Sequence, residues 1–268
     1  MIKDIQSLTD TRGIDVQKVG VDNVHLPFLL KCKNGEHQPV LAKIRLTVGL
    51  PHNFKGTHMS RFIEVLNKWS QKPINSDEIG NILREITMRT DAQGAHIEMS
   101  FKYFLPRVAP VSGCSAILDY DITFQGELDA EGNYDFVLGA AVPITSLCPC
   151  SKEISRHGAH NQRSTIYAQI RYECPVGFIW IEDLIDMIER QASAPVYPIL
   201  KREDEKHVTE QAYENPKFVE DIIRDIVLTF RAHPYMTWFD VECSNHESIH
   251  NHDAYARHTE NIERGTGG

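Results

Sequence analysis

The order in which strand-like and helix-like segments follow one another constrains the fold of this chain most. Two apolar runs, residues 21–32 and 37–50, flank Asn34-Gly35, a dipeptide typical of tight hairpin turns. Two amphipathic segments follow: residues 61–71, with Ser60 as the expected N-cap, and a segment from Ser76 with an acidic first turn. Strand-like runs at 94–107 and 114–128 complete a ββααββ order.

The second half repeats this order after the polar break at 129–133. Residues 134–145 and 164–174 are predicted strands, 179–193 a helix and 194–214 a loop. Asn215-Pro216 is expected to cap and open a helix over 217–233, before strands at 237–245 and 252–262. The two halves share element order rather than residue identity, at a spacing of roughly 110–120 residues.

This pattern predicts an α+β fold of two tandem units, each an antiparallel sheet with two helices on one face. The expected boundaries are an N-terminal arm (1–22), a first unit (23–130), a second unit with most of the active site (131–262) and a flexible tail (263–268). Sheet faces and edge strands without cover predict a homo-oligomer.

Composition narrows the partners. A net charge of −9 argues against a nucleic-acid-binding surface. No run approaches the roughly 20 apolar residues of a membrane span, and the N-terminus lacks the apolar core of a signal peptide. We therefore expect a cytoplasmic protein with neither nucleic acid nor a membrane as partner.

The segment Cys148-Pro149-Cys150 is the first candidate for chemistry, with His160 ten residues after the second cysteine. We expect the proline to hold the segment extended, so that both thiols face one site. Two buried small residues are the plain alternative, but thiolate and imidazole are preferred zinc and iron ligands. A catalytic metal needs a third ligand, for which the candidates are histidines near the C-terminus and three carboxylates: Glu203, Asp204 and Glu205.

Two further candidates have equally plain explanations. Glu220 has Arg224 at i+4, which favours a surface ion pair, although a carboxylate there could also accept two N–H donors from guanine. Lys55, His58 and Arg61 precede a helix and could bind phosphate, or could form an exposed basic turn.

Taken together, several motifs resemble the type IB GTP cyclohydrolase I family of prokaryotes, and the resemblance runs over nearly the whole chain. They are "GTHMSRF", "PITSLCPCSKEIS", "GAHNQRS", "YENPKFVEDIIRD" and "ECSNHESIHNHDAYA".

The resemblance implies the tunnelling fold, in which ββααββ units assemble into barrels, and a homotetramer with active sites at subunit interfaces. The implied reaction converts GTP and water to 7,8-dihydroneopterin triphosphate and formate, the entry to folate-type pterins. It implies one divalent metal per active site, with Mn, Fe and Zn left open, and no organic cofactor.

Residue roles follow from the same resemblance. Cys148, His160 and Glu205 correspond to metal ligands, with Glu203, where a proline is usual, as a competitor for Glu205. The remaining roles are Cys150 near the reacting carbon, Glu220 as guanine anchor, Glu247 close to the metal and counted with its ligands, His250 (or, less favoured, His246) for proton transfer, and Lys152, His58 and Arg61 for the triphosphate.

Five alternatives stay open at this point. The chain could act on a related purine or pterin, could make a variant product such as a cyclic phosphate, or could be a nitrile reductase that uses NADPH and a nucleophilic cysteine. Outside enzymes of this fold, the two cysteines could form a redox pair in a regulatory protein. They could also belong to a binding module with a structural zinc.

Overall fold

The computed structural model describes residue 6 and residues 9–173 and 177–263, and it divides the chain into two compact units. The first unit comprises the chain up to Lys102 together with Thr123–Leu138. The second comprises Tyr103–Ile122 and the chain from Gly139 onward. Strands β4 (Ala95–Val108), β5 (Ser115–Leu128) and β6 (Tyr134–Leu147) contribute residues to both units.

The first unit is built on the predicted hairpin. Strand β1 (Val16–Lys31) pairs antiparallel with β2 (His37–Leu50), which pairs in turn with β4, while the short β3 (Pro73–Ile74) lies parallel to β1. Gly35 takes a φ of 82° at the turn, a backbone conformation that L side chains rarely adopt. The hairpin prediction is confirmed, although β1 begins at Val16, inside the stretch expected to be an arm.

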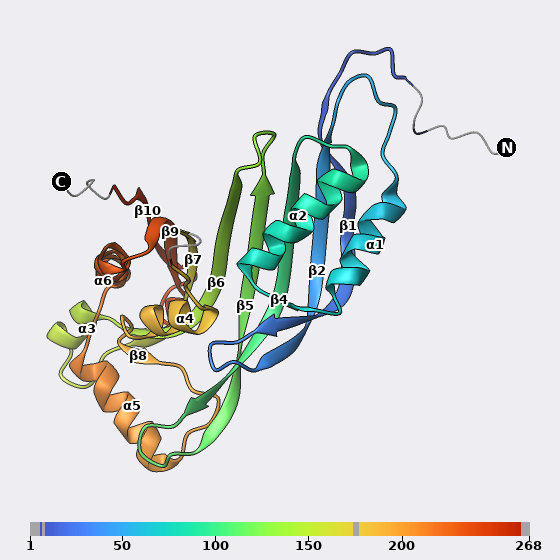
Figure 1. Cartoon of the computed structure of the whole chain (residues 1–268). Helices are drawn as coiled ribbons and strands as arrows, with labels where there is room; N and C mark the ends of the chain where they lie inside the picture. The colour runs from blue at the N-terminus through green and yellow to red at the C-terminus, as the bar shows by residue number, and fades with distance from the viewer. Residues whose placement is uncertain (1–5, 7–8, 174–176, 264–268) are drawn as a thin grey trace, which may run out of the picture. The chain divides into compact units, whose positions relative to one another are not determined.

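Two helices cover one face of these strands (Figure 1). Helix α1 (Met59–Trp69) buries Phe62, Val65 and Leu66, and begins after His58 rather than after the expected cap Ser60. Helix α2 (Ser76–Thr90) begins after Asn75, whose side chain accepts the amide of Asp77, and presents four buried aliphatic residues to the sheet: Ile79, Ile82, Leu83 and Ile86.

The second unit has strand order β10-β9-β7-β6-β5-β4, with the short β8 (Ala194–Pro195) paired to β6. The added strands are β7 (Asn161–Tyr172), β9 (Met236–Asn245) and β10 (Ala254–Asn261). Its helices are α3 (Pro149–Ile154), α4 (Ile181–Glu189), α5 (Arg202–Glu214) and α6 (Val219–Ala232). None of the helices in the described ranges is long and apolar enough to cross a bilayer.

Three local predictions for this unit are wrong. The Cys-Pro-Cys segment is not extended, because Pro149 takes the first position of α3, where its missing N–H costs no hydrogen bond. The stretch 194–214, expected to be a loop, contains helix α5, which is hard to recognise because its only buried residues are Asp204 and Ala212. Asn215 ends α5 instead of opening α6, which begins after Phe218.

The fold is thus α+β, and the expected strand–helix–strand order holds with additions. In the first half, helices α1 and α2 lie between two strand pairs. In the second half, α4 and α6 hold the corresponding places, and α3 and α5 are additional helices. Assembly of such units into barrels stays a prediction. The predicted strand end at Cys174 lies outside the described residues.

Candidate active site in the second unit

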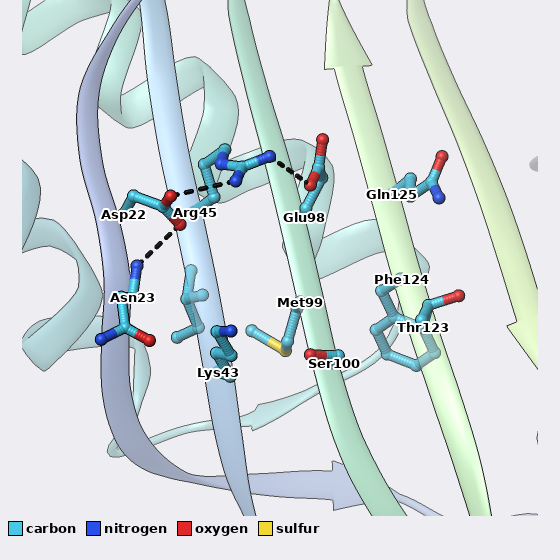
Figure 2. A pocket seen from close by; sticks show the side chains of 11 residues that line it. Asp22, Asn23, Lys43, Arg45, Glu98, Met99, Ser100, Thr123, Phe124 and Gln125 are labelled. Carbon is cyan, nitrogen blue, oxygen red and sulfur yellow. Dashed lines mark hydrogen bonds and ion pairs between the residues drawn. The ribbon is translucent and has the colours of Figure 1, made fainter.

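A hollow of about 440 Å³ lies over the strands of the first unit (Figure 2). At its rim the Arg45 guanidinium bridges Asp22 at 2.9 Å and Glu98 at 3.0 Å. These three side chains are about half exposed, where ion pairs contribute little to stability. No residue that the sequence predicts for the site lines this hollow.

The second unit brings Cys148 and His160 together at the adjoining ends of β6 and β7. The Cys148 amide donates to the His160 carbonyl at 3.1 Å. Ser151 links the same two residues, because its hydroxyl donates to the Cys148 carbonyl (3.1 Å) and accepts from the His160 amide (3.2 Å). The Cys148 sulfur caps α3 by accepting the Ser151 amide at 3.4 Å. Two of the predicted metal ligands are therefore held side by side by backbone contacts.

The surroundings of His160 determine which ring nitrogen carries the proton. Nδ1 lies 3.0 Å from Oε1 of Gln162 and 3.8 Å from a carboxylate oxygen of Glu247. The Gln162 amide nitrogen donates to the Ser146 hydroxyl at 2.7 Å, which turns its oxygen toward the histidine. Because both neighbours of Nδ1 are acceptors, Nδ1 carries the hydrogen and Nε2 keeps its lone pair, the form that binds a metal.

Gln162 is a site residue that the sequence reasoning missed. It is buried, at 6% exposure, although it carries a polar side chain in a strand that starts at the surface. The signal was its place two residues after His160, at the second position of strand β7, since alternate residues of extended backbone point to the same face.

Helix α5 packs against the segments that carry these two residues. Ala212 forms a buried cluster with Leu147 and Ala194, against which Val208 and Ala159 pack, so the residues immediately before Cys148 and His160 lie in the packing of this helix. Glu205 shares the helix face of Val208 and Ala212, at positions i, i+3 and i+7. Both glutamates are exposed, but Glu203 lies on the opposite side of the helix, with His207 and Glu210. Helix phase therefore favours Glu205 over Glu203 as the third ligand.

Asp204, the third carboxylate of this run, is fully buried. It accepts hydrogen bonds from the amides of Val111, Ser112 and Lys201, each at 2.8 Å, and from the Ser112 hydroxyl at 2.6 Å. Burial alone would raise the pKa of this carboxyl, but these four donors hold its pKa well below the usual range. With its oxygens occupied in this way, Asp204 serves the packing of α5 rather than ligation.

The start of helix α6 is tied to the same point of the sheet. The Lys217 amide donates to the Leu147 carbonyl at 3.0 Å, and the Lys217 ammonium pairs with Asp225 at 2.7 Å. Glu220 follows three residues later, exposed in the first turn of α6. The alternative of an i,i+4 ion pair is not favoured, since Arg224 pairs with Asp221 at 2.9 Å.

The turn between β9 and β10 completes this end of the unit. The His246 amide donates to the Arg163 carbonyl at 3.0 Å, which sets the turn beside the start of β7. The ring of His246 faces Asp253 at 3.1 Å, whereas the His250 ring stacks on His252 with centroids 4.9 Å apart. His250 is exposed, as a group that exchanges protons with a bound molecule must be.

The predicted triphosphate residues are engaged elsewhere. Lys152 donates to the Tyr213 carbonyl at the end of α5 and lies 4.4 Å from the Tyr213 ring centroid. Arg61 donates to the Arg89 carbonyl at the end of α2, and both Arg61 and His58 belong to the first unit. Cys150 is a free, exposed thiol on α3. The triphosphate roles of Lys152, His58 and Arg61 stay predictions.

The donor types suit a divalent metal, since a thiolate, an imidazole Nε2 and a carboxylate form a mixed set that Zn²⁺, Fe²⁺ and Mn²⁺ all accept. In the described parts of the chain, however, no three histidine, cysteine or carboxylate side chains converge closely enough to hold an ion. Cys148 and His160 are in place, with Glu247 behind His160. The third ligand is the missing element.

Comparison with known families decides what kind of protein carries this arrangement. The family model described as type I GTP cyclohydrolase folE2 matches residues 2–256. The chain belongs to this family. Among its relatives, GTP cyclohydrolase FolE2 of Geobacter sulfurreducens is 53% identical over 253 residues, covering 94% of this chain and 96% of the relative. The FolE2 protein of Geobacter metallireducens is 51% identical over the same length.

Solved structures place the fold. A uricase from Bacillus fastidious superposes with a TM-score of 0.58 at 9% identity, covering 92% of this chain and 94% of that one. A uricase from Arthrobacter globiformis gives a TM-score of 0.51, also at 9% identity, with 94% and 95% covered. This chain therefore shares the uricase fold, while identities this low carry no information about its activity.

Proposed function

We propose that this chain is a metal-dependent GTP cyclohydrolase I, which converts GTP and water into 7,8-dihydroneopterin triphosphate and formate. The observation that carries the proposal is the pairing of Cys148 with His160 in a chain that matches the FolE2 family over nearly its whole length. The reaction is the first step toward folate-type pterins.

We assign the metal to Cys148, His160 and Glu205. His160 offers Nε2 because Nδ1 donates toward Gln162 and Glu247, and the exposed Glu205 shares the side of α5 whose Val208 and Ala212 pack beside those segments. On this arrangement Glu247 orients His160 rather than binding the ion itself. A divalent cation held by these residues would act as a Lewis acid and would lower the pKa of water for the hydrolysis at C8 of guanine.

The other residues bind and transfer protons. Glu220, in the first turn of α6, accepts the paired N–H groups of guanine and so fixes the purine over the cysteines. His250 exchanges protons with the ribose carbons as the sugar rearranges and closes onto the freed amine. Cys150, exposed one helix position beyond Pro149, lies beside the reacting carbon.

We also assign a homotetramer with active sites at subunit interfaces. One observation supports this assignment: the strand order of the second unit ends at β10, an eight-residue edge strand. The backbone N–H and C=O groups on the outer side of an edge strand can pair with a strand of another subunit. Light scattering should give a mass about four times the 30.5 kDa of one chain. A monomer with full turnover would refute this assignment.

The decisive experiment measures formate released from GTP by chelator-treated protein, before and after addition of Mn²⁺, Fe²⁺ or Zn²⁺. We expect no formate without metal and turnover with at least one ion. Cys148→Ala should abolish metal binding and turnover, and Glu205→Gln should weaken metal binding and abolish turnover. Glu203→Gln, which makes the same change of charge on the outer face of α5, should retain both. Folded protein that releases no formate with any metal would redirect the function to another purine or pterin.

A further inference from the structure

Among the acidic residues that the structure describes, the most buried one lies between two exposed ones. Asp204 has no exposed surface, whereas Glu203 and Glu205 on either side of it are exposed. A buried carboxylate is retained only where hydrogen bonds replace its water, and Asp204 accepts four of them at 2.6–2.8 Å. The assigned ligand Glu205 thus directly follows Asp204 in the sequence, the residue whose side chain anchors helix α5 most firmly.

The anchor is the turn between β4 and β5, which belongs to the same unit. Consecutive amides of Val111 and Ser112 point at one oxygen of Asp204, and the Ser112 hydroxyl at the other. The turn is closed by the Ala109 amide on the Cys114 carbonyl at 2.8 Å, with Gly113 at a φ of 69°. The closed turn therefore orients the donors of Val111 and Ser112 independently of Asp204, in the manner of a backbone nest for an anion.

Asp204 also sets the first turn of α5. Its second oxygen accepts the Lys201 amide at 2.8 Å, and the Lys201 carbonyl accepts the Glu205 amide at 2.9 Å. At the other end of the helix, the Lys152 ammonium holds the Tyr213 carbonyl. With both ends held and Val208 packed between them, neither the register nor the rotation of α5 is free.

We propose that Asp204 is a positioning residue for the metal site: by binding the β4–β5 turn it fixes the backbone of Glu205 so that this carboxylate can join Cys148 and His160. This proposal rests on the proposed function, because it assigns Asp204 to the metal ligand next to it. Loss of an outer residue that orients a ligand typically weakens metal affinity by about 10–100-fold.

The test measures Mn²⁺ affinity by chelator competition on folded apo-protein, in a double-mutant cycle of Asp204→Asn with Glu205→Gln. The asparagine keeps the shape of Asp204 but cannot accept all four donors. We expect Asp204→Asn to weaken Mn²⁺ binding about 10–100-fold in the wild-type background, and less than about threefold when Glu205 is already glutamine. Glu210→Gln, an exposed carboxylate on the same helix, is the matched control and should bind Mn²⁺ normally.

The outcomes separate the two claims. If Glu205→Gln weakens binding while Asp204→Asn does not, the metal site stands and the positioning role is wrong. If Asp204→Asn weakens binding equally in both backgrounds, it does not act through Glu205, and the role is again wrong. Normal binding by Glu205→Gln overturns the ligand assignment together with this proposal. Should Asp204→Asn not fold, Ser112→Ala replaces it, with a few-fold weaker affinity expected and unchanged affinity counting against the role.

Discussion

Replacement of Gln162 by methionine tests how the fold prepares His160. Methionine keeps the length of the side chain but removes the acceptor on Nδ1 of His160 at 3.0 Å and the donor to Ser146 at 2.7 Å. Ser146 is fully buried, so its hydroxyl loses one partner without gaining water. Two hydrogen bonds at about 1 kcal/mol each predict a stability loss of roughly 1–3 kcal/mol.

The larger effect should fall on the metal. Without its oriented acceptor the imidazole can rotate and change tautomer, which predicts about 10–100-fold weaker metal affinity, or roughly 1.4–2.8 kcal/mol. The assay is chelator competition with Mn²⁺ on folded protein, with urea unfolding run in parallel to measure stability.

Ser164→Ala supplies the control for Gln162→Met. Its hydroxyl is buried and lies 3.2 Å from Ser146, at the far end of the same hydrogen-bonded chain. This variant should lose about 1 kcal/mol of stability and keep its metal affinity. If folded Gln162→Met bound Mn²⁺ as tightly as Ser164→Ala does, the orientation argument for His160 would be refuted.

Three further predictions concern stability and reactivity. Tyr120→Phe removes the hydroxyl that donates to buried Glu189 at 2.6 Å. This substitution should lower the free energy of unfolding, measured by urea titration, by about 1–3 kcal/mol, and a loss under about 0.5 kcal/mol would contradict the prediction. Hydrogen bonds led by Arg231 lower the pKa of Glu260 to about 2. In the unfolded chain a glutamate has a pKa near 4.3, so the lowered pKa of Glu260 stabilises the fold at a pH above that value. The difference in free energy of unfolding between wild type and Glu260→Gln should therefore narrow as the pH falls from about 5 toward 2. A constant difference would count against the prediction. Burial raises the pKa of the Cys243 thiol to about 12, so this thiol should resist iodoacetamide at pH 8 until the protein unfolds. The exposed thiol of the Cys-Pro-Cys segment should react in the native state, and equal reaction rates of the two thiols would contradict the burial of Cys243.

Local patterns determined much of this protein. The Asn34-Gly35 turn, the helical spacing in α1 and α2 and the long apolar strands were readable because each depends on neighbours within a few residues. The set of motifs likewise identified the family, which the match over residues 2–256 confirms. Helix α5 was not predicted because only two apolar residues, Val208 and Ala212, lie on its packed side beside acidic ones, which leaves no apolar period to detect.

The tertiary structure decided what each chemical group does. The residue pattern supplied three adjacent carboxylates, and the family resemblance favoured Glu205, with Glu203 as its competitor. Only the packing of α5 shows that Asp204 is buried, and that Glu205 shares the side of Val208 and Ala212 whereas Glu203 lies opposite. The sequence also offered His160 as a candidate ligand, but the tautomer of its ring depends on Gln162 and on Glu247. Glu247 lies in a turn 87 positions further along the chain. Burial, helix phase and hydrogen-bond direction arise from contacts between distant segments, and no local pattern encodes them.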